Sequence, residues 1–348
     1  MPAIYFRTDG NEEIATGHIM RCLSVARACT AFHAGIVFLV SDEKSMALLM
    51  ERFTCPDEFS VQCLHSDYKN LEEELPVLQS ILSSTEESWI FIDSYYVTEN
   101  YLSNLQKFCR TAYLDDILAF DYPVDMIINY DMETGETPSC YRKAAQKLLG
   151  VSYTPLREQF QNVSYEVKPE VKNILISTGG TDTYNIAGEL LRKVLDNASL
   201  RTCHYHIITS RFNSHFQELE QSASHNPAIH IHENVQDMAA LMAECDLAVS
   251  AGGTTLYELC AVGVPAVSFA LADNQLNAVE TFSKSPIIPY AGDVRLSLTA
   301  VTEAVILFLE ESARSYERRK KSSQRMRAFI DGNGSSRIAA AFFANTDK

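Results

Sequence analysis

One histidine is placed where it could take a proton during a reaction. His18 follows Gly17 in a loop that starts with Arg7, Thr8 and Asp9 and ends in the first turn of a predicted helix. The positive end of the helix dipole disfavours an imidazolium ion there, so we expect a neutral ring that can accept a proton. A lone histidine that only hydrogen-bonds its own loop is the simpler alternative. The position of His18 after the first predicted strand favours the catalytic interpretation.

A second candidate is a turn that contains the adjacent glycines Gly252 and Gly253. The turn follows a short apolar run, typical of a buried parallel strand, and precedes a helix that Thr254 or Thr255 can cap. Such a turn is a natural anion site, because free N–H groups and the helix dipole point at the same place. Glu258 lies one turn into the helix, where a carboxylate suits the two hydroxyls of a ribose. A turn that binds nothing, with Glu258 favoured only by the dipole, explains the stretch equally well.

Two further turns in the C-terminal half also follow predicted strands and precede helices. Their residues are Gly179, Gly180, Thr181, Asp273, Asn274 and Gln275. Packing alone could explain the two glycines. Asn274 can donate and accept hydrogen bonds at once, as an amide that holds a substrate and a water must, but it could equally be an ordinary helix cap.

Metal and cofactor motifs are weak or absent. His204 with His206, and His230 with His232, each place two imidazoles on one face of a predicted strand, but neither pair has a third ligand near it in the sequence. There is no GxxxxGK[ST] phosphate loop, and the one GxG, at Gly332, does not follow a strand. We therefore expect neither a cofactor nor a metal ion.

Composition limits the kinds of partner. The 348 residues carry a net charge of −16 and are 46% hydrophobic, so nucleic acid is not an expected partner. The nine cysteines form no CxxC pair and are best explained as free thiols in a reducing compartment. No signal peptide is visible and no apolar run approaches the roughly 20 residues of a membrane span. We expect a cytoplasmic monomer without a membrane partner.

Strand and helix patterns alternate in both halves, which predicts parallel sheets covered by helices. The expected strands are residues 4–8, 35–40, 60–64, 89–93, 112–115, 126–129, 173–178, 204–209, 229–232, 247–250, 266–269 and 287–289. The expected domains are an N-terminal Rossmann-like domain (1–152), a linker (153–170), a C-terminal Rossmann-like domain (171–330) and a final helix (331–348) that packs back on the first domain. Ligands then belong at the carboxyl ends of the strands.

Taken together, these motifs resemble the UDP-sugar hydrolases of pseudaminic acid biosynthesis, which act on UDP-2,4-diacetamido-2,4,6-trideoxy-beta-L-altropyranose. The motifs that carry the resemblance lie at residues 7–9, 17–23, 92–95, 114–116, 177–182, 250–258 and 272–275. The family is similar in fold to the UDP-N-acetylglucosamine transferase of peptidoglycan synthesis. The resemblance therefore implies an α/β protein of GT-B type, with two Rossmann-like domains facing each other across a cleft.

The resemblance also implies roles for single residues. His18 would deprotonate the water that attacks the anomeric carbon with inversion, Tyr95 would lie beside the sugar, and Asn274 would fix the substrate or the water. The implied substrate contacts are Arg7, Asp9, Gly17, Arg21, Gly179, Gly180, Thr181, Gly252, Gly253, Thr254, Thr255, Glu258, Asp273 and Gln275. The helix dipole stabilises the departing UDP anion, so no strong general acid is required, and the implied mechanism demands no metal.

Three alternatives to this hydrolase remain open at the level of sequence. A glycosyltransferase of the same fold would use its base on an acceptor hydroxyl instead of water. A related hydrolase would share the main motifs but cleave a different UDP-diacetamido sugar. A binding module would hold the nucleotide sugar without turning it over.

Overall fold

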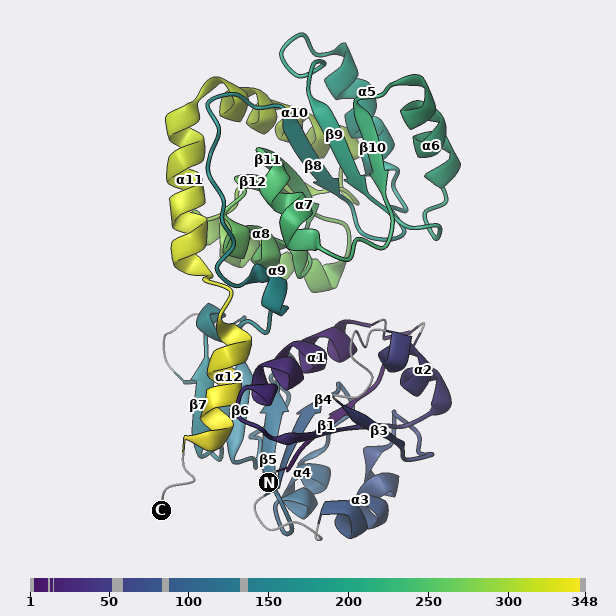
Figure 1. Ribbon diagram of the computed structural model, residues 1–348, viewed down its shortest axis with the longest axis vertical. Coiled ribbons are helices and arrows are strands. Elements are labelled where there is room, and N and C mark those ends of the chain that lie inside the picture. Colours follow the sequence, from purple (N-terminus) through teal and green to yellow (C-terminus); the bar gives the residue numbers. More distant parts are fainter. Residues whose placement is uncertain are drawn as a thin grey trace. The chain divides into compact units, whose positions relative to one another are not determined.

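The chain forms two compact units in the computed structural model, which describes residues 3–11, 13–14, 16–51, 59–82, 88–131 and 137–344, apart from the side chain of Asn274. One unit comprises Met1–Glu158 with Gly332–Lys348, and the other comprises Gln159–Asp331. Each unit is a parallel sheet with helices on both faces (Figure 1). The prediction of two α/β domains with parallel sheets is therefore confirmed.

The first unit is built on a seven-stranded sheet in the order β3-β2-β1-β4-β5-β6-β7. Its strands are β1 (Ala3–Thr8), β2 (Gly35–Val40), β3 (Ser60–Cys63), β4 (Trp89–Asp93), β5 (Arg110–Leu114), β6 (Met126–Asn129) and β7 (Gln146–Leu149). The central strands are almost wholly buried, as expected for parallel strands covered on both faces. The strand order reverses direction between β1 and β4, and in such sheets this is where ligands bind.

Helices cover both faces of this sheet. They are α1 (Gly17–Thr30), α2 (Glu43–Glu51), α3 (Leu75–Leu82), α4 (Glu99–Leu105) and α12 (Gly334–Phe343), with a 3₁₀ turn, η1, over Leu71–Glu74. The C-terminal helix α12 packs against α1 within this unit (Figure 1). Its Phe342 ring meets those of Trp89 and Phe91 at centroid distances of 5.2 and 6.2 Å. Residues from both ends of the chain therefore share one core.

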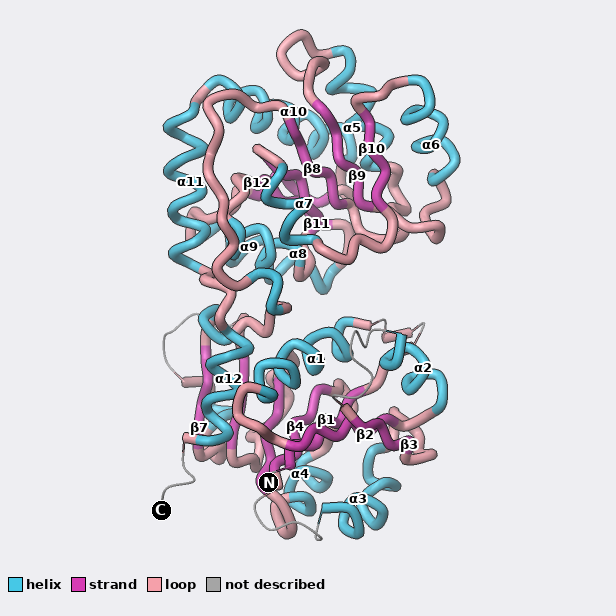
Figure 2. Tube along the Cα trace, in the orientation of Figure 1, coloured by secondary structure: helices cyan, strands magenta, loops and turns pink. Residues whose placement is uncertain are grey.

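The second unit has a six-stranded parallel sheet in the order β10-β9-β8-β11-β12-β13. Its strands are β8 (Asn173–Ser177), β9 (His204–Ile208), β10 (Ile229–His232), β11 (Leu247–Ala251), β12 (Ala266–Ala270) and β13 (Tyr290–Asp293). Its helices are α5 (Ile186–Asp196), α6 (Phe216–His225), α7 (Met238–Glu244), α8 (Thr255–Val262), α9 (Asp273–Lys284), α10 (Leu298–Arg314) and α11 (Tyr316–Phe329). Figure 2 shows the same elements as a tube. The order reverses between β8 and β11, as it does between β1 and β4 in the first unit.

The last strand lies elsewhere than expected. The apolar residues at 287–289 predict a strand, but β13 begins only at Tyr290. Ile287 and Ile288 are buried in the turn before it, and Pro289, which has no N–H to donate, accepts a hydrogen bond from Ser268 N at 2.8 Å. The apolar pattern located the buried residues, whereas the strand itself begins at Tyr290, one residue after the predicted range.

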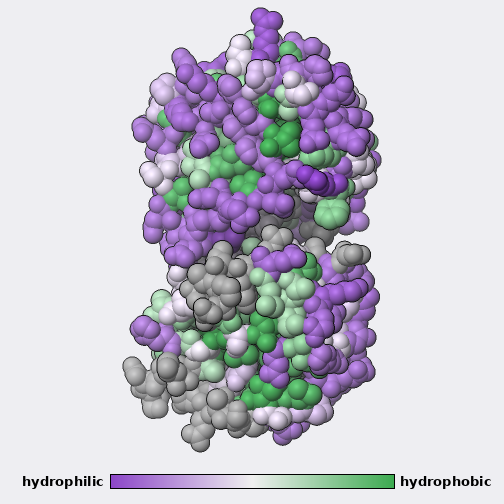
Figure 3. All heavy atoms as spheres, turned by 45° about the vertical axis from the view of Figure 1, so that its right-hand side comes forward, coloured by the Kyte–Doolittle hydropathy of each residue, from purple (hydrophilic) through white to green (hydrophobic). Residues whose placement is uncertain are grey.

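The polarity of the surface and the state of the cysteines are the next features of the fold. Hydrophilic side chains cover most of the second unit on the face that Figure 3 presents. The eight cysteines that the structure describes are all free thiols, as expected. Within the described residues, every helix is too short or too polar to cross a lipid bilayer.

Candidate functional site

His18 is joined to a carboxylate by the order of the first sheet. Because β1 pairs with β4, Thr8 at the end of β1 lies beside Asp93 at the end of β4. The helix that follows β1 starts at Gly17, so His18 in its first turn reaches that edge. His18 Nδ1 lies 2.5 Å from Asp93 Oδ1. An ionised carboxylate only accepts hydrogen bonds, so Nδ1 carries the hydrogen and donates it.

The other ring nitrogen of His18 is left for a different partner. Nε2 makes no hydrogen bond within the described residues. With Nδ1 protonated towards Asp93, a neutral ring has its lone pair on Nε2, which is the arrangement of a general base oriented by a carboxylate. His18 is 4% exposed, so water can reach only a small part of its side chain.

Arg21 secures the same carboxylate from the next turn of α1. Its Nε donates to Asp93 Oδ2 at 2.9 Å and its Nη2 to Asp93 Oδ1 at 2.8 Å, a bidentate pair. Its Nη1 donates to Asp116 Oδ2 at 3.0 Å and contacts the Tyr130 hydroxyl at 2.9 Å. Burial alone would raise the pKa of Asp93, but the positive charge of Arg21 and the hydrogen bonds from His18 and Arg21 outweigh that effect and lower the pKa. Asp93 is therefore an anion throughout the neutral range.

Tyr95 stands beside the His18 ring. Their ring centroids are 4.4 Å apart and the planes are nearly perpendicular. Tyr95 is 48% exposed, unlike the histidine it covers. Partial burial, with the nearby Asp116 carboxylate, raises the pKa of Tyr95, so its hydroxyl remains a hydrogen-bond donor at neutral pH. The position suits a side chain that contacts a ligand next to His18.

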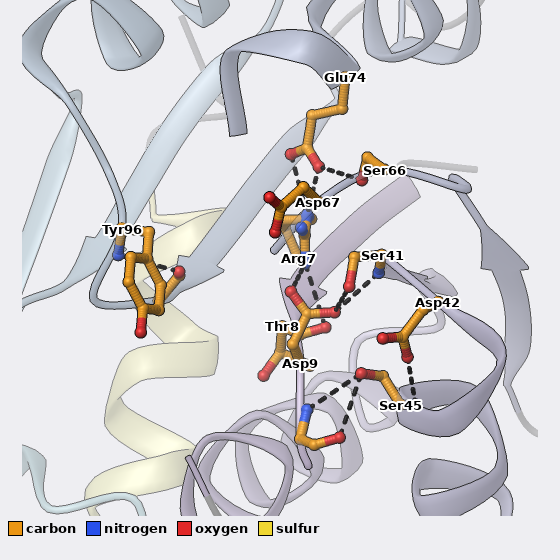
Figure 4. A network of polar contacts seen from close by, with 12 residues as sticks. Arg7, Thr8, Asp9, Ser41, Asp42, Ser45, Ser66, Asp67, Glu74 and Tyr96 are labelled. Atoms are coloured by element: carbon orange, nitrogen blue, oxygen red, sulfur yellow. Dashed lines mark hydrogen bonds and ion pairs between the residues drawn. The ribbon is translucent and has the colours of Figure 1, made fainter. Parts of the chain in front are cut away.

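Arg7 and Asp9 belong to a buried network instead (Figure 4). The Arg7 guanidinium is fully buried, with Nε 2.9 Å from Glu74 Oε1 and Nη1 paired with Asp9. Asp9 accepts hydrogen bonds from the amide and hydroxyl of Ser41 at 2.7 and 2.8 Å. Burial alone would lower the pKa of Arg7, but the charges of Glu74 and Asp9 outweigh this effect, and the pKa is raised. We therefore propose that this pair positions the first loop, not that it makes the ligand contact that the loop sequence suggests.

The glycine turns of the second unit meet at one edge of its sheet. Because β8 pairs with β11, Ser177 lies beside Ser250, and the turns that follow both strands leave from the same edge. Gly179 has a φ of 86°, a left-handed conformation that favours glycine, and Gly179, Gly180 and Thr181 are exposed. The sheet order thus brings together two turns that lie about 70 residues apart in the sequence.

The two glycines of the second turn have different reasons to be glycine. A Cβ on Gly252 would lie 2.4 Å from Val279 Cγ1 and 3.1 Å from the carbonyl oxygen of Gln275, so close packing against α9 requires glycine there. A Cβ on Gly253 would meet nothing within 4 Å. Space above Gly253 is therefore open for a ligand to approach the backbone.

The start of α8 offers unpaired amides. Thr254 is the N-cap residue, but its side chain makes no capping hydrogen bond, contrary to the expected cap. Within the described residues the N–H groups of Thr254 and Thr255 have no acceptor. Glu258 lies in the first turn of this helix. Unpaired N–H groups at a helix N-terminus can hold an anion.

The third turn leads into α9, and the N-cap of this helix is not Asp273 or Asn274, as a capping role for these residues would require. Asp273 is exposed and pairs with Arg295 at 2.6 Å, and the N-cap position is held by Ala272 without a side-chain bond. Gln275 Oε1 accepts from Leu271 N at 3.0 Å and so closes the turn. The side chain of Asn274 lies outside the described part of the chain.

The two histidine pairs come together across neighbouring strands. In the β9–β10 pair, His204 Nδ1 lies 3.0 Å from His230 Nε2, and His206 Nδ1 lies 3.0 Å from His232 Nε2. Burial, together with the neighbouring imidazoles, lowers the pKa of His206 to about 4. Within the described residues these four rings do not bring three ligand atoms within 4.8 Å of one another, so they do not form a compact metal site.

Asp93, Asp116 and Tyr130 are the site residues that motif reasoning left without a role. Asp93 is the only charged residue of β4, an otherwise apolar buried strand next to β1. A carboxylate at that end of such a strand is costly to bury unless a cation pairs with it. This signal is present in the sequence, and it predicts a partner on the loop or helix after β1.

Residues 174–331 match the family model of the glycosyltransferase family 28 C-terminal domain. That match covers the strands and turns of the second unit, including both glycine turns.

Three curated relatives are similar over parts of the chain. An uncharacterised protein of Methanocaldococcus jannaschii is 25% identical over 293 residues, 77% of this chain and 55% of that protein. The spore coat polysaccharide biosynthesis protein SpsG of Bacillus subtilis is 26% identical over 193 residues, 55% of this chain and 56% of that protein. The Helicobacter pylori protein named pseudaminic acid cytidylyltransferase and UDP-2,4-diacetamido-2,4,6-trideoxy-beta-L-altropyranose hydrolase is 27% identical over 154 residues, 43% of this chain and 26% of that protein. The chain thus spans only about half the length of the first two relatives.

Solved structures support the fold. MurG of Acinetobacter baumannii has a TM-score of 0.66 at 14% identity, over 99% of this chain and 100% of that one. TcCGT1, solved in complex with UDP, has a TM-score of 0.65 at 11% identity, over 99% of both chains. The expected GT-B type of fold is confirmed by these similarities, which at such identities say nothing about the reaction.

Proposed function

We propose that this chain is an enzyme that removes UDP from a UDP-linked diacetamido-trideoxyhexose by attack of water at the anomeric carbon. The observation that carries the proposal is the contact between His18 Nδ1 and Asp93, which leaves Nε2 without a partner in the described chain. The partial similarity to the Helicobacter pylori protein supports the substrate class, because its name includes such a hydrolase.

In this proposal His18 is the general base. Nε2 takes a proton from the attacking water, the water oxygen bonds to C1 of the sugar with inversion, and the C1–O bond to UDP breaks. Asp93 is a positioning residue: it keeps the hydrogen on Nδ1 and stabilises the imidazolium that forms. Tyr95 contacts the sugar beside His18, and Asn274 fixes the substrate or the water.

The turns of the second unit bind UDP. The amides of Thr254 and Thr255 hold the pyrophosphate, Glu258 accepts hydrogen bonds from the ribose, and Gly179 and Gly253 let the backbone approach the ligand. A diphosphate that leaves as an anion is stabilised by the α8 dipole, so a strong general acid is not needed.

A glycosyltransferase is the second candidate. The match of residues 174–331 to a glycosyltransferase domain favours it, since that domain type is named for sugar transfer. The same His18–Asp93 pair could then deprotonate an acceptor hydroxyl. The two reactions differ only in what reaches His18 Nε2.

An NMR time course without an acceptor separates them. Candidate UDP-diacetamido-trideoxyhexoses are incubated with the chain in buffer alone, and free sugar and UDP are followed. Stoichiometric release of both at a catalytic rate supports the hydrolase. Binding of the UDP-sugar without release, followed by turnover once a sugar acceptor is added, would favour the transferase instead.

A further inference from the structure

A cysteine, a histidine and a glutamate converge in the first unit, next to Ser41 and without a contact to His18 or Asp93. Cys63 is the last residue of β3, His65 follows two residues later, and Glu43 is the first residue of α2. One ligand atom from each, the thiol sulfur, a ring nitrogen and a carboxylate oxygen, lies within 4.8 Å of the other two. No other group of three histidine, cysteine or acidic side chains within the described residues meets this condition.

The distance between the sulfur and the nitrogen fits one metal geometry well. Cys63 Sγ lies 3.5 Å from His65 Nδ1. Tetrahedral zinc, with Zn–S near 2.3 Å and Zn–N near 2.0–2.1 Å, separates two such ligand atoms by about 3.5 Å. The observed sulfur–nitrogen separation therefore matches the separation that a shared tetrahedral ion requires. Glu43 is exposed, so its carboxylate can swing the remaining distance.

The backbone under these ligands is well held. Leu64 N donates to Val40 O at 2.8 Å and Ser66 N to Ser41 O at 3.0 Å, which ties the 63–66 segment to the end of β2. His65 has a left-handed φ of 52°. In an extended strand, side chains two residues apart are well separated along the strand, and this turn shortens the distance from His65 to Cys63.

From these contacts we propose that Cys63, His65 and Glu43 form a binding site for a zinc-class divalent transition metal. One sulfur, one nitrogen and one oxygen ligand is a donor set that suits zinc and disfavours magnesium or calcium. Three protein ligands leave a fourth position for water. The ion links the end of β3 to the start of α2, so its binding stabilises the first unit.

The site stands apart from the proposed reaction. None of its three ligands contacts His18, Asp93 or Arg21, and the proposed hydrolysis requires no metal. Loss of the ion should therefore weaken the fold of the first unit without abolishing chemistry at His18.

Cobalt substitution in the full chain tests the site. After treatment with a chelator, Co²⁺ is titrated in, and we expect one equivalent to give thiolate charge-transfer absorption together with the intense visible bands of tetrahedral Co²⁺. Cys63→Ser should remove the charge-transfer band, and His65→Asn and Glu43→Gln should weaken Co²⁺ and Zn²⁺ binding by at least about tenfold. Zinc should raise the midpoint of thermal unfolding of the wild type but not of Cys63→Ser.

Matched variants show whether the effect belongs to this site. Cys140→Ser removes another partly exposed thiol of the same unit, His33→Asn removes a histidine with a similar left-handed φ of 56°, and Glu51→Gln changes the far end of α2. All three should keep the wild-type spectrum and affinity. The proposal is overturned if the wild type binds no Co²⁺, if its spectrum lacks the sulfur band, or if only changes to the histidines of β9 and β10 reduce binding.

Discussion

At the residue scale, the main finding is that His18 is part of a chain of polar contacts. Asp93 orients its ring, and Arg21 keeps Asp93 ionised while also reaching Asp116 and Tyr130. The sequence alone predicts a neutral histidine from the helix dipole. The structure adds an oriented histidine, because a carboxylate next to Nδ1 selects the tautomer of the ring.

Removing the base gives the first prediction. We expect His18→Asn to lower kcat for UDP-sugar hydrolysis by about 10²- to 10⁴-fold, the usual contribution of a general base, with little effect on UDP affinity. The exposed His33→Asn in the same unit is the control and should leave kcat unchanged. Steady-state kinetics with UDP detection measures both. Loss of UDP affinity in step with kcat would instead indicate a binding role for His18.

Asp93 should make stability depend on pH in a defined direction. Its folded-state pKa is lowered below 3.8, so its stabilising contribution is present above about pH 4 and is lost as pH falls through the lowered value. We expect Asp93→Asn to lower the free energy of unfolding at pH 7 by about 3 kcal/mol, because Arg21 loses its main partner.

Trp89, the only tryptophan, lies in β4 and reports unfolding of the first unit. Urea denaturation followed by its fluorescence should show the difference between wild type and Asp93→Asn shrinking below about pH 4. Asp196→Asn, at the exposed end of α5, should match the wild type throughout. A difference that stays constant down to pH 3 would mean that folding does not lower the pKa of Asp93.

At the scale of elements, the position of each turn followed from simple patterns, but the pairing of turns did not. Gly-Gly after an apolar run predicts a tight turn at the end of β11, and the structure has one. Which turns share an edge depends on strand order, and no local pattern encodes it. The short edge strand β7 illustrates the same limit. Its first two residues, Gln146 and Lys147, are polar and give no strand pattern in the sequence, and the segment is a strand because it pairs with β6.

A pair of glycine variants tests the anion site at the start of α8. Gly252→Ala should destabilise the second unit by about 1–3 kcal/mol, because its Cβ would overlap Val279. Gly253→Ala has room for its Cβ, so we expect near-normal stability but at least tenfold weaker UDP binding. Calorimetric titration with UDP and thermal unfolding measure the two effects. Unchanged UDP affinity in Gly253→Ala would place the pyrophosphate elsewhere.

At the scale of the whole molecule, the chain returns to its first unit at the end. The charged helix α11 packs on α8 in the second unit, and α12 then joins the core of the first. The break at Asp331–Gly334 and the apolar run after it predict this helix from the sequence, and Ser335 Oγ ties its start to the first unit by donating to Leu156 O at 2.8 Å. Gly334 lies so close to Thr154 that a Cβ would overlap the Thr154 carbonyl oxygen.

The docking of α12 should be measurable through Phe342. Its ring is almost fully buried against Trp89 and Phe91, so we expect Phe342→Ala to destabilise the first unit by about 3–5 kcal/mol. Phe212→Ala removes a phenylalanine that is 86% exposed and should change stability by less than about 0.5 kcal/mol. Denaturation midpoints from Trp89 fluorescence and circular dichroism should separate the variants. Equal midpoints would show that α12 does not hold the first unit together.

The route of one oxygen atom tests the central proposal most directly. The chain is supplied with the proposed UDP-diacetamido sugar in ¹⁸O-labelled water, with no acceptor, and the products are analysed by mass spectrometry while NMR identifies the first anomer. If water activated at His18 attacks C1, UDP carries no label and the sugar is released with its anomeric configuration inverted. Label in the UDP phosphate, or release of the retained anomer, would contradict that mechanism.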